Sequence, residues 1–213
     1  MKDISEISSS VIARLPRYYR FLCELQKNGT ERISSKELSA KMGLTASQIR
    51  QDFNCFGGFG QQGYGYKTEQ LIKELSAVMG LNELKSAILV GAGNMGRAVA
   101  SQMSFETMGF SLKAIFDSDP LFKGMSLKGL PIRSADELEA WCAENKTDMA
   151  ILCIPQEATP AVADKLVMLG VNSFWNFSHY DIHSKHPFVN VANVHLSDSL
   201  MTLSYTIKNN GKG

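Results

Sequence analysis

The residues with the clearest chemical meaning form a glycine-rich segment directly after the short apolar stretch 86–90: Gly91-Ala92-Gly93-Asn94-Met95-Gly96. At this spacing Gly91 permits a tight turn, Gly93 lets the backbone approach a pyrophosphate, and Gly96 lets the next helix close on a sheet. That helix is predicted over 97–108, and its first N–H groups would face the phosphates. The segment therefore predicts a dinucleotide-binding loop, with a plain strand-to-helix turn as the alternative.

An acidic residue, Asp117, lies 21 residues after Gly96, at the end of a strand predicted over 112–116. A carboxylate at this place can accept hydrogen bonds from both ribose hydroxyls and repels a 2′-phosphate. We therefore expect NADH and NAD+ as ligands rather than their 2′-phosphorylated forms.

The elements that must position this loop alternate along the chain. Strands are predicted over 149–154 and 171–177, and helices over 136–145 and 158–169. Such alternation predicts an α/β fold, a parallel, doubly wound Rossmann sheet that binds its ligand at the carboxyl ends of the strands. The residues expected at that edge, where a nicotinamide ring could lie, are Ile154, Pro155, Asn176, Phe177 and Ser178.

The four histidines are the candidates for an acid/base group or a metal ligand: His179, His183, His186 and His195. His179 and His183 are four residues apart, but Asp181 and Pro187 nearby indicate a loop rather than a metal-bearing helix. Exposed or capping histidines are the favoured interpretation. We therefore expect no metal, no catalytic residue and no enzymatic activity.

The first eighty residues have a different pattern. Ser34 and Glu37 form a capping box that opens a short helix ended by Gly43. Thr45 and Gln48 form a second capping box, which opens a helix over 47–53. Two short capped helices joined by a turn that contains glycine are typical of a helix-turn-helix.

The second of these helices would be the recognition helix, in which Ser47, Gln48, Arg50 and Gln51 can reach bases or phosphates. A preceding helix over 11–25 carries Arg14 and Arg17 for phosphates, and its predicted apolar stripe is Ile12, Leu15, Tyr18, Tyr19, Leu22 and Leu25. Aromatic residues alternating with glycines over 56–66 predict a wing. Its expected DNA contacts are Gly58, Phe59, Gln61, Gln62 and Tyr64. An all-helical packing module with solvated arginines is the alternative.

Charge and composition agree with two separate parts. The chain of 213 residues has a net charge of +1, but residues 1–80 hold 11 basic and 8 acidic side chains, and residues 81–213 hold 11 and 13. The four cysteines are far apart, and no apolar run is long enough to span a membrane. These features predict a cytoplasmic protein with free thiols.

The end of the chain reads as an amphipathic helix over 196–209. Its apolar residues are Leu196, Leu200, Leu203 and Ile207 on one stripe, with Met201 and Tyr205 beside it. Packing on its own subunit is one interpretation, and exchange into a dimer mate is the sharper one.

Taken together, the sequence resembles the bacterial redox-sensing transcriptional repressors of the Rex family over nearly its whole length. The resemblance is carried by Arg14–Leu22, Ser34–Leu38, Gln48–Phe53, Phe56–Gly60, Gly63–Tyr66, Gly91–Gly96, Phe116–Pro120 and Asn176–Phe177. It implies a homodimer with winged-helix domains, NAD(H)-binding Rossmann domains and a C-terminal helix swapped between subunits. It also implies double-stranded operator DNA as a partner that is released when NADH is high.

Two positions depart from the family pattern. An acidic residue often follows the Asn-Val pair near the tail helix and pairs with an arginine of the first helix, but here His195 follows Asn193-Val194 while Arg20 fills the arginine position. A basic residue often precedes the Gly-x-Gly-Tyr string of the wing, where this chain has Gln61-Gln62. Arg20 and His195 are therefore the candidate switch residues, and readout would rest more on Arg50, Gln48 and Gln51.

These observations predict an NADH-responsive repressor with three parts: a winged-helix domain (1–80), a Rossmann domain (81–194) and an exchange helix with its tail (195–213). The alternatives are a small NAD-dependent oxidoreductase with a DNA-binding appendage, a CoA-binding Rossmann protein, and a structural dimeric regulator without a ligand.

Overall fold

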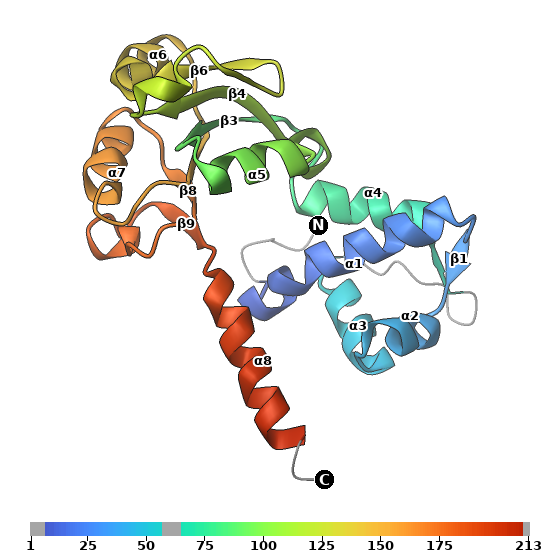
Figure 1. Cartoon of the computed structure of the whole chain (residues 1–213). Coiled ribbons are helices and arrows are strands. Elements are labelled where there is room, and N and C mark those ends of the chain that lie inside the picture. Colours follow the sequence, from blue (N-terminus) through green and yellow to red (C-terminus); the bar gives the residue numbers. More distant parts are fainter. Residues whose placement is uncertain (1–6, 57–64, 211–213) are drawn as a thin grey trace. The chain divides into compact units, whose positions relative to one another are not determined.

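The computed structural model describes residues 7–56 and 65–210, and its chain divides into two units, Met1–Glu83 and Leu84–Gly213 (Figure 1). The residues of the predicted wing that we named as DNA contacts (Gly58, Phe59, Gln61, Gln62 and Tyr64) lie outside these ranges. Each unit is described by itself.

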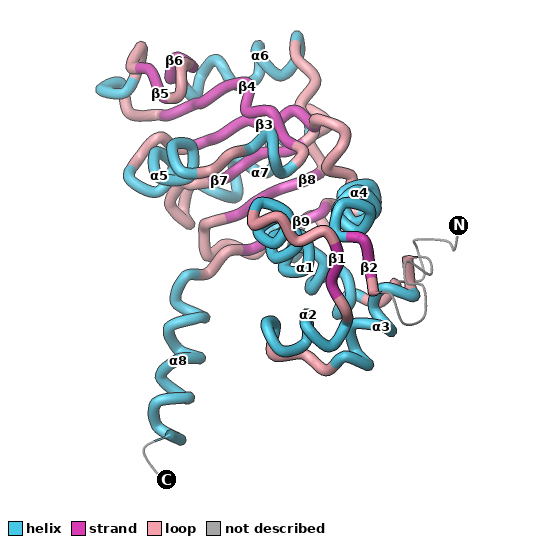
Figure 2. The backbone as a smooth tube through the Cα atoms, turned by 90° about the vertical axis from the view of Figure 1, so that its right-hand side faces the viewer, coloured by secondary structure: helices cyan, strands magenta, loops and turns pink. Residues whose placement is uncertain are grey.

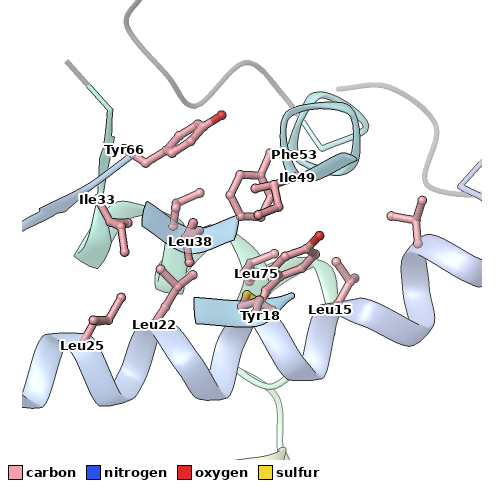
Figure 3. Packing of buried hydrophobic residues seen from close by; sticks show 13 residues of the cluster. Leu15, Tyr18, Leu22, Leu25, Ile33, Leu38, Ile49, Phe53, Tyr66 and Leu75 are labelled. Atoms are coloured by element: carbon pink, nitrogen blue, oxygen red, sulfur yellow. The ribbon is translucent and has the colours of Figure 1, made fainter. Parts of the chain in front are cut away.

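The described residues of the first unit form four helices and a small two-stranded sheet. Its helices are α1 (Ser9–Lys27), α2 (Ser35–Met42), α3 (Ala46–Asn54) and α4 (Thr68–Val78), and β1 (Arg32–Ile33) pairs antiparallel with β2 (Tyr66–Lys67). All of these elements contribute to one apolar core, which includes Leu15, Tyr18, Leu22, Ile49 and Phe53 (Figure 3). The helix-turn-helix therefore packs on α1 and α4 as a closed module.

The local signals at the helix ends act largely as the sequence predicts. Ser34 accepts from the Glu37 N–H, and the Glu37 side chain accepts from the Ser34 N–H, which completes the first capping box. Gly43 ends α2 in the left-handed conformation. The second box is only half formed: Thr45 accepts from the Gln48 N–H, but the Gln48 amide donates to Asp52 instead of turning back.

One prediction for α1 is wrong in detail. Ile12 is 49% exposed, and Val11 is the buried residue in that turn. Val11 lies four residues before Leu15 and seven before Tyr18, so it falls on the inner face of the helix with them, whereas Ile12 is turned by about a further 100° toward solvent.

The second unit contains a seven-stranded sheet in the order β5-β6-β4-β3-β7-β8-β9, which can be followed strand by strand in Figure 2. The strands are β3 (Lys85–Val90), β4 (Phe110–Asp117), β5 (Ser126–Leu127), β6 (Leu130–Ser134), β7 (Met149–Leu152), β8 (Ser173–Asn176) and β9 (Asn190–Asn193). All neighbours pair in parallel except β5 with β6. Counted from β3, the parallel strands have the order 3-2-1-4-5-6, as in dinucleotide-binding domains.

Helices cover both faces of this sheet. On one face lie α5 (Asn94–Gln102) and the 3-10 helix η2 (Phe105–Met108), and on the other α6 (Leu138–Glu144) and α7 (Thr159–Met168). Three further 3-10 helices lie in the connections: η3 (Pro120–Phe122), η4 (Ala135–Glu137) and η5 (Ile182–Ser184). The predicted parallel, doubly wound α/β fold is therefore present.

The helix predicted over 97–108 is interrupted. The chain becomes extended at Met103, after α5, and resumes as η2 at Phe105. This break places the Phe105 ring in the core beneath the sheet, where it is 3% exposed. Burial of a phenylalanine ring contributes about 1.5–3 kcal/mol, which offsets the loss of regular helical hydrogen bonds at the break.

The last helix, α8 (Leu196–Asn210), exposes its apolar side chains. Leu196, Leu200, Leu203 and Ile207 are between 52% and 68% exposed, and Met201 and Tyr205 beside them are also exposed. Within the described part of the second unit, this apolar stripe does not pack on the sheet or on the helices that cover it. None of the described helices combines the length and the apolar character that crossing a lipid bilayer requires.

Candidate functional site

The glycine segment lies where the sheet reverses its strand order. The Gly91 N–H donates to the Phe116 carbonyl at 2.8 Å, so the loop leaves β3 beside the end of β4. Gly91 has φ +100°, and a Cβ atom there would lie 2.4 Å from the Cys153 carbonyl oxygen. A Cβ on Gly96 would lie 1.8 Å from the Gly91 carbonyl oxygen. Both positions therefore require glycine, for the turn and for the close approach of α5.

Gly93 differs from these two glycines. It is the N-cap of α5, no cap hydrogen bond from a side chain is present, and a Cβ built on it would meet nothing within 4 Å. The backbone of the first turn of α5 therefore faces open space, with the positive end of the helix dipole behind it. This is the arrangement that accommodates a pyrophosphate. Asn94 and Met95 follow in this turn, and the Asn94 side chain accepts from Arg97 at 2.9 Å.

Asp117 ends β4 and lies beside the same loop. Its Oδ2 accepts from the Ala92 N–H at 2.5 Å, and its Oδ1 accepts from the Asp119 N–H at 2.8 Å. Each carboxylate oxygen has two lone pairs. The two backbone bonds thus occupy one position on each oxygen and leave one on each, which matches a pair of ribose hydroxyls.

Of the residues predicted at the nicotinamide edge, Asn176 has a side chain that is hydrogen-bonded within its own unit. Its side chain is buried, donates to the Tyr180 carbonyl and to Asn193 Oδ1 at 2.9 Å each, and accepts from the Ser178 N–H and Oγ. Asn176 therefore shapes the turn that carries Phe177. Ser178 is also buried, whereas Ile154, Pro155 and Phe177 remain partly exposed at this edge.

A thiol lies close to the glycine loop. Cys153 follows β7, and its N–H donates to the Val90 carbonyl at 2.8 Å. Burial raises the pKa of its thiol to about 12, so the group is neutral at ordinary pH and a weak nucleophile.

The helix-turn-helix unit contains a charged group that the sequence analysis missed. Asp52, on α3, is 1% exposed. Arg14 donates to both of its oxygens at 2.7 and 2.8 Å, the Tyr18 hydroxyl donates at 2.7 Å and the Gln48 amide at 2.9 Å. Four hydrogen bonds occupy the four lone-pair positions of the carboxylate. The sequence did contain a signal for this group: Asp52 is an acidic residue one turn after Gln48, on the core side of the predicted recognition helix.

These bonds lower the pKa of the Asp52 carboxyl. Burial on its own raises that pKa, but the hydrogen bonds from Arg14, Tyr18 and Gln48 outweigh it. Burial and the bond to Asp52 raise the pKa of Tyr18, so its hydroxyl remains a donor. Arg14, which we predicted as a phosphate contact, thus has a structural partner inside the unit.

The other predicted DNA contacts lie on the surface of this unit. Ser47, Arg50 and Gln51 are exposed on α3, and Gln48 is half-buried. Arg50 donates to Ser35 Oγ at 3.1 Å, and Arg17 donates to the Met42 carbonyl at 2.5 Å. Their contacts with DNA remain predictions.

The two candidate switch residues belong to different units. Arg20 is exposed on α1. The His195 ring stacks on that of His179 with centroids 5.0 Å apart, and its Nδ1 is 3.6 Å from the Asp198 carboxylate. Within the described ranges, no group of three or more His, Cys, Asp or Glu side chains is arranged to hold a metal ion.

Known proteins match both units and the whole chain. Residues 6–54 match a family model described as "Putative DNA-binding protein N-terminus", and residues 82–180 match one described as "CoA binding domain". Two relatives, from Thermoanaerobacter pseudethanolicus and Clostridium beijerinckii, each carry the name redox-sensing transcriptional repressor Rex. Each is 49% identical over 207 residues, which cover 97% of this chain and 92% and 98% of the respective relatives.

Solved structures of a Rex-family repressor called RSP are also similar. The complex of RSP with β-NAD+ and operator DNA has a TM-score of 0.88 at 49% identity, and covers 96% of this chain and 94% of that one. The complex with β-NADH has a TM-score of 0.88 at 46% identity, and covers 97% and 96%.

Proposed function

This chain belongs to the Rex family of redox-sensing transcriptional repressors, and we propose that it binds operator DNA as a homodimer and releases that DNA when it binds NADH. The observation that carries this proposal is the joining, in one chain, of a capped helix-turn-helix to a sheet with dinucleotide-binding strand order.

On the DNA side, α3 would enter the major groove with its N-terminal half. Ser47, Gln48, Arg50 and Gln51 would make base or phosphate contacts, and Arg17 would contact a phosphate. The wing would add contacts from Gly58, Phe59, Gln61, Gln62 and Tyr64. Arg14 contributes by holding α3 against α1 through Asp52.

On the nucleotide side, the loop from Gly91 to Gly96 would hold the pyrophosphate, with the open backbone at Gly93 as the closest approach. Asp117 would accept from the two ribose hydroxyls on the lone pairs that Ala92 and Asp119 leave unused. Ile154, Pro155 and Phe177 would line the nicotinamide end, and Asn176 with Ser178 would keep that turn in shape. When bound, NADH and NAD+ supply a signal that depends on the redox state of the ring.

The exposed apolar stripe of α8 supports the homodimer. Side chains such as Leu200, Leu203 and Ile207 are costly to leave in water, and exchange into a dimer mate buries them. To shift the ratio of DNA-releasing to DNA-binding dimers from 1:99 to 99:1, NADH must bind the DNA-releasing form about 10⁴-fold more tightly than the DNA-binding form. If the two NADH sites of a dimer act together, each site requires about a 100-fold difference in affinity between the two forms. A difference of this size is within the normal range of ligand coupling.

The decisive experiment is a titration of NADH against operator binding at several fixed concentrations of NAD+, using the duplex found in the RSP complex. We expect NADH to release the DNA and NAD+ to raise the NADH concentration required. Operator binding that ignores NADH, while the protein demonstrably binds it, would contradict the proposal.

Two further measurements separate the alternatives. A thermal-shift comparison should give stabilisation by NADH that exceeds that by NADPH or CoA, because Asp117 repels the ribose phosphate that NADPH carries at the 2′ position and CoA at the 3′ position. A larger shift with CoA would instead favour the activity named by the second family model. Steady NADH turnover with a panel of carbonyl compounds would indicate an oxidoreductase, whereas ligand sensing requires none.

A further inference from the structure

Gln48 differs from its polar neighbours on α3. Ser47 and Gln51 are exposed, whereas Gln48 is half-buried and its amide nitrogen donates to Asp52 Oδ1 at 2.9 Å. The two residues are one helical turn apart, so the bond runs along the face that turns toward α1. Gln48 is therefore held in place before any DNA is bound.

Asp52 also determines which end of the Gln48 amide faces its carboxylate. An ionised carboxylate only accepts hydrogen bonds. Arg14 and Tyr18 hold Asp52 in its ionised form and occupy three of its lone-pair positions. If the Gln48 amide were turned by 180°, two acceptor oxygens would face each other. The nitrogen must therefore point to Asp52, and the carbonyl oxygen lies at the opposite corner.

We propose that Asp52 determines part of the operator specificity of this protein, because it fixes the Gln48 amide with its hydrogen-bond acceptor directed to the DNA. In the major groove, adenine N6 and cytosine N4 offer amino donors, whereas guanine O6 and thymine O4 are acceptors. The Gln48 oxygen thus favours a base with an amino group at the position it faces, while the second N–H of the amide, which Asp52 does not use, lies beside that oxygen. This inference rests on the proposed function, and Asp52 acts in it as a positioning residue.

The test measures Kd for the RSP operator duplex and for duplexes that carry each single base-pair substitution. For the wild type, we expect about a 10-fold preference for an amino base at one position of each half-site, within the range for one base contact. Gln48→Met keeps the length of the side chain and should remove this preference. Asp52→Asn offers a donor as well as an acceptor and no longer orients the Gln48 amide, so the preference should fall to within about 2-fold.

Gln51 provides the matched control, since it has the same side chain on the same helix but is exposed. In the Asp52→Asn background, adding Gln48→Met should change the preference no further, whereas Gln51→Met should have the same effect in both backgrounds. An unchanged preference in Asp52→Asn overturns the inference and leaves the proposed function intact. A wild type that does not bind the duplex overturns both.

A second measurement is independent of whether Asp52→Asn folds. In NMR spectra of the free wild-type protein, the side-chain amide of Gln48 should give one proton that is shifted downfield and exchanges more slowly with water than either proton of Gln51. Side-chain amides of Gln48 and Gln51 that exchange equally fast would overturn the inference.

Discussion

Asp52 in the first unit and Asp117 in the second are both held by several hydrogen bonds, but their donors differ in kind. Asp52 is bound by side chains from two helices, which fill all four lone-pair positions. Asp117 is bound by two backbone N–H groups, which fill one position on each oxygen. The Asp52 carboxylate is thus saturated by its own chain, whereas Asp117 is partly exposed and keeps one unused lone-pair position on each oxygen, as the proposed ribose contact requires.

The glycines of the loop also differ in whether atoms of their own chain already surround them. At Gly91 and Gly96, a side chain would collide with backbone atoms of the same unit, so these two glycines serve the fold. At Gly93 there is open space, so glycine is required there only if something else approaches. Residues that look equivalent in a motif can thus be divided into structural and ligand-binding ones by what already surrounds them.

The largest expected effect is on stability, at the saturated carboxylate. Asp52→Ala leaves Arg14 and Tyr18 without their partner and should lower the free energy of unfolding of the first unit by about 3 kcal/mol. Hydrogen exchange of the α1 and α3 amides measures this change within the unit. Tyr18→Phe, which removes one of the four bonds, should cost about 1.5 kcal/mol, the lower end of the range for a hydrogen bond to a charged group. Equal costs for the two variants would contradict the saturated network.

The next effect is on ligand binding, at the half-satisfied carboxylate. Asp117→Ala should weaken NADH binding by about 100-fold, because charged hydrogen bonds to ribose hydroxyls contribute about 1.5–3 kcal/mol each. Its cost in stability should be smaller than that of Asp52→Ala, because Asp117 is partly exposed and loses two hydrogen bonds instead of four. Asp119→Ala is the control, since Asp119 accepts from the Leu121 N–H and caps η3. Calorimetric titration with NADH should find the control within about 3-fold of the wild type.

A smaller effect distinguishes the glycines. Gly93→Ala should leave the melting temperature unchanged and weaken NADH binding by about 10-fold, because the new methyl group occupies the approach of the pyrophosphate. Gly96→Ala should instead lower the melting temperature, because its Cβ would collide with the Gly91 carbonyl. Equal melting temperatures for the two variants would contradict this division.

The smallest effect is a dependence on pH. The pKa of the Asp52 carboxyl is held below its ordinary value of 3.8, so its ionised form stabilises the folded state above that pH. The stabilisation is lost as the pH falls through the lowered pKa. Protection of the α1 and α3 amides should therefore be steady from about pH 7 to 5 and decline below about pH 4. The decline should be shallower in Asp52→Ala, and an identical decline would show that other carboxylates cause it.

The sequence predicted much of the fold correctly where the signals are local. The Ser34–Glu37 capping box, the end of α2 at Gly43 and the tight turn at Gly91 all appear as expected. Errors arose where packing competes with local preference: Val11 is buried instead of Ile12, and the helix after Gly96 breaks so that Phe105 can enter the core. The spacing of apolar residues does not reveal which of two neighbouring residues is buried, or where a helix breaks.

For the sites, the sequence determined which residues are available, and only the tertiary structure decided how they are used. Capping, glycine turns and the alternation of strands and helices depend on residues a few positions apart, so they can be read directly from the chain. Arg14 meets Asp52 across 38 positions, Ala92 meets Asp117 across 25, and Asn176 meets Asn193 across 17. A hydrogen bond requires its partners within about 3 Å. Only the folded backbone brings such distant residues that close, and it thereby separates the structural carboxylate from the one placed for a ligand.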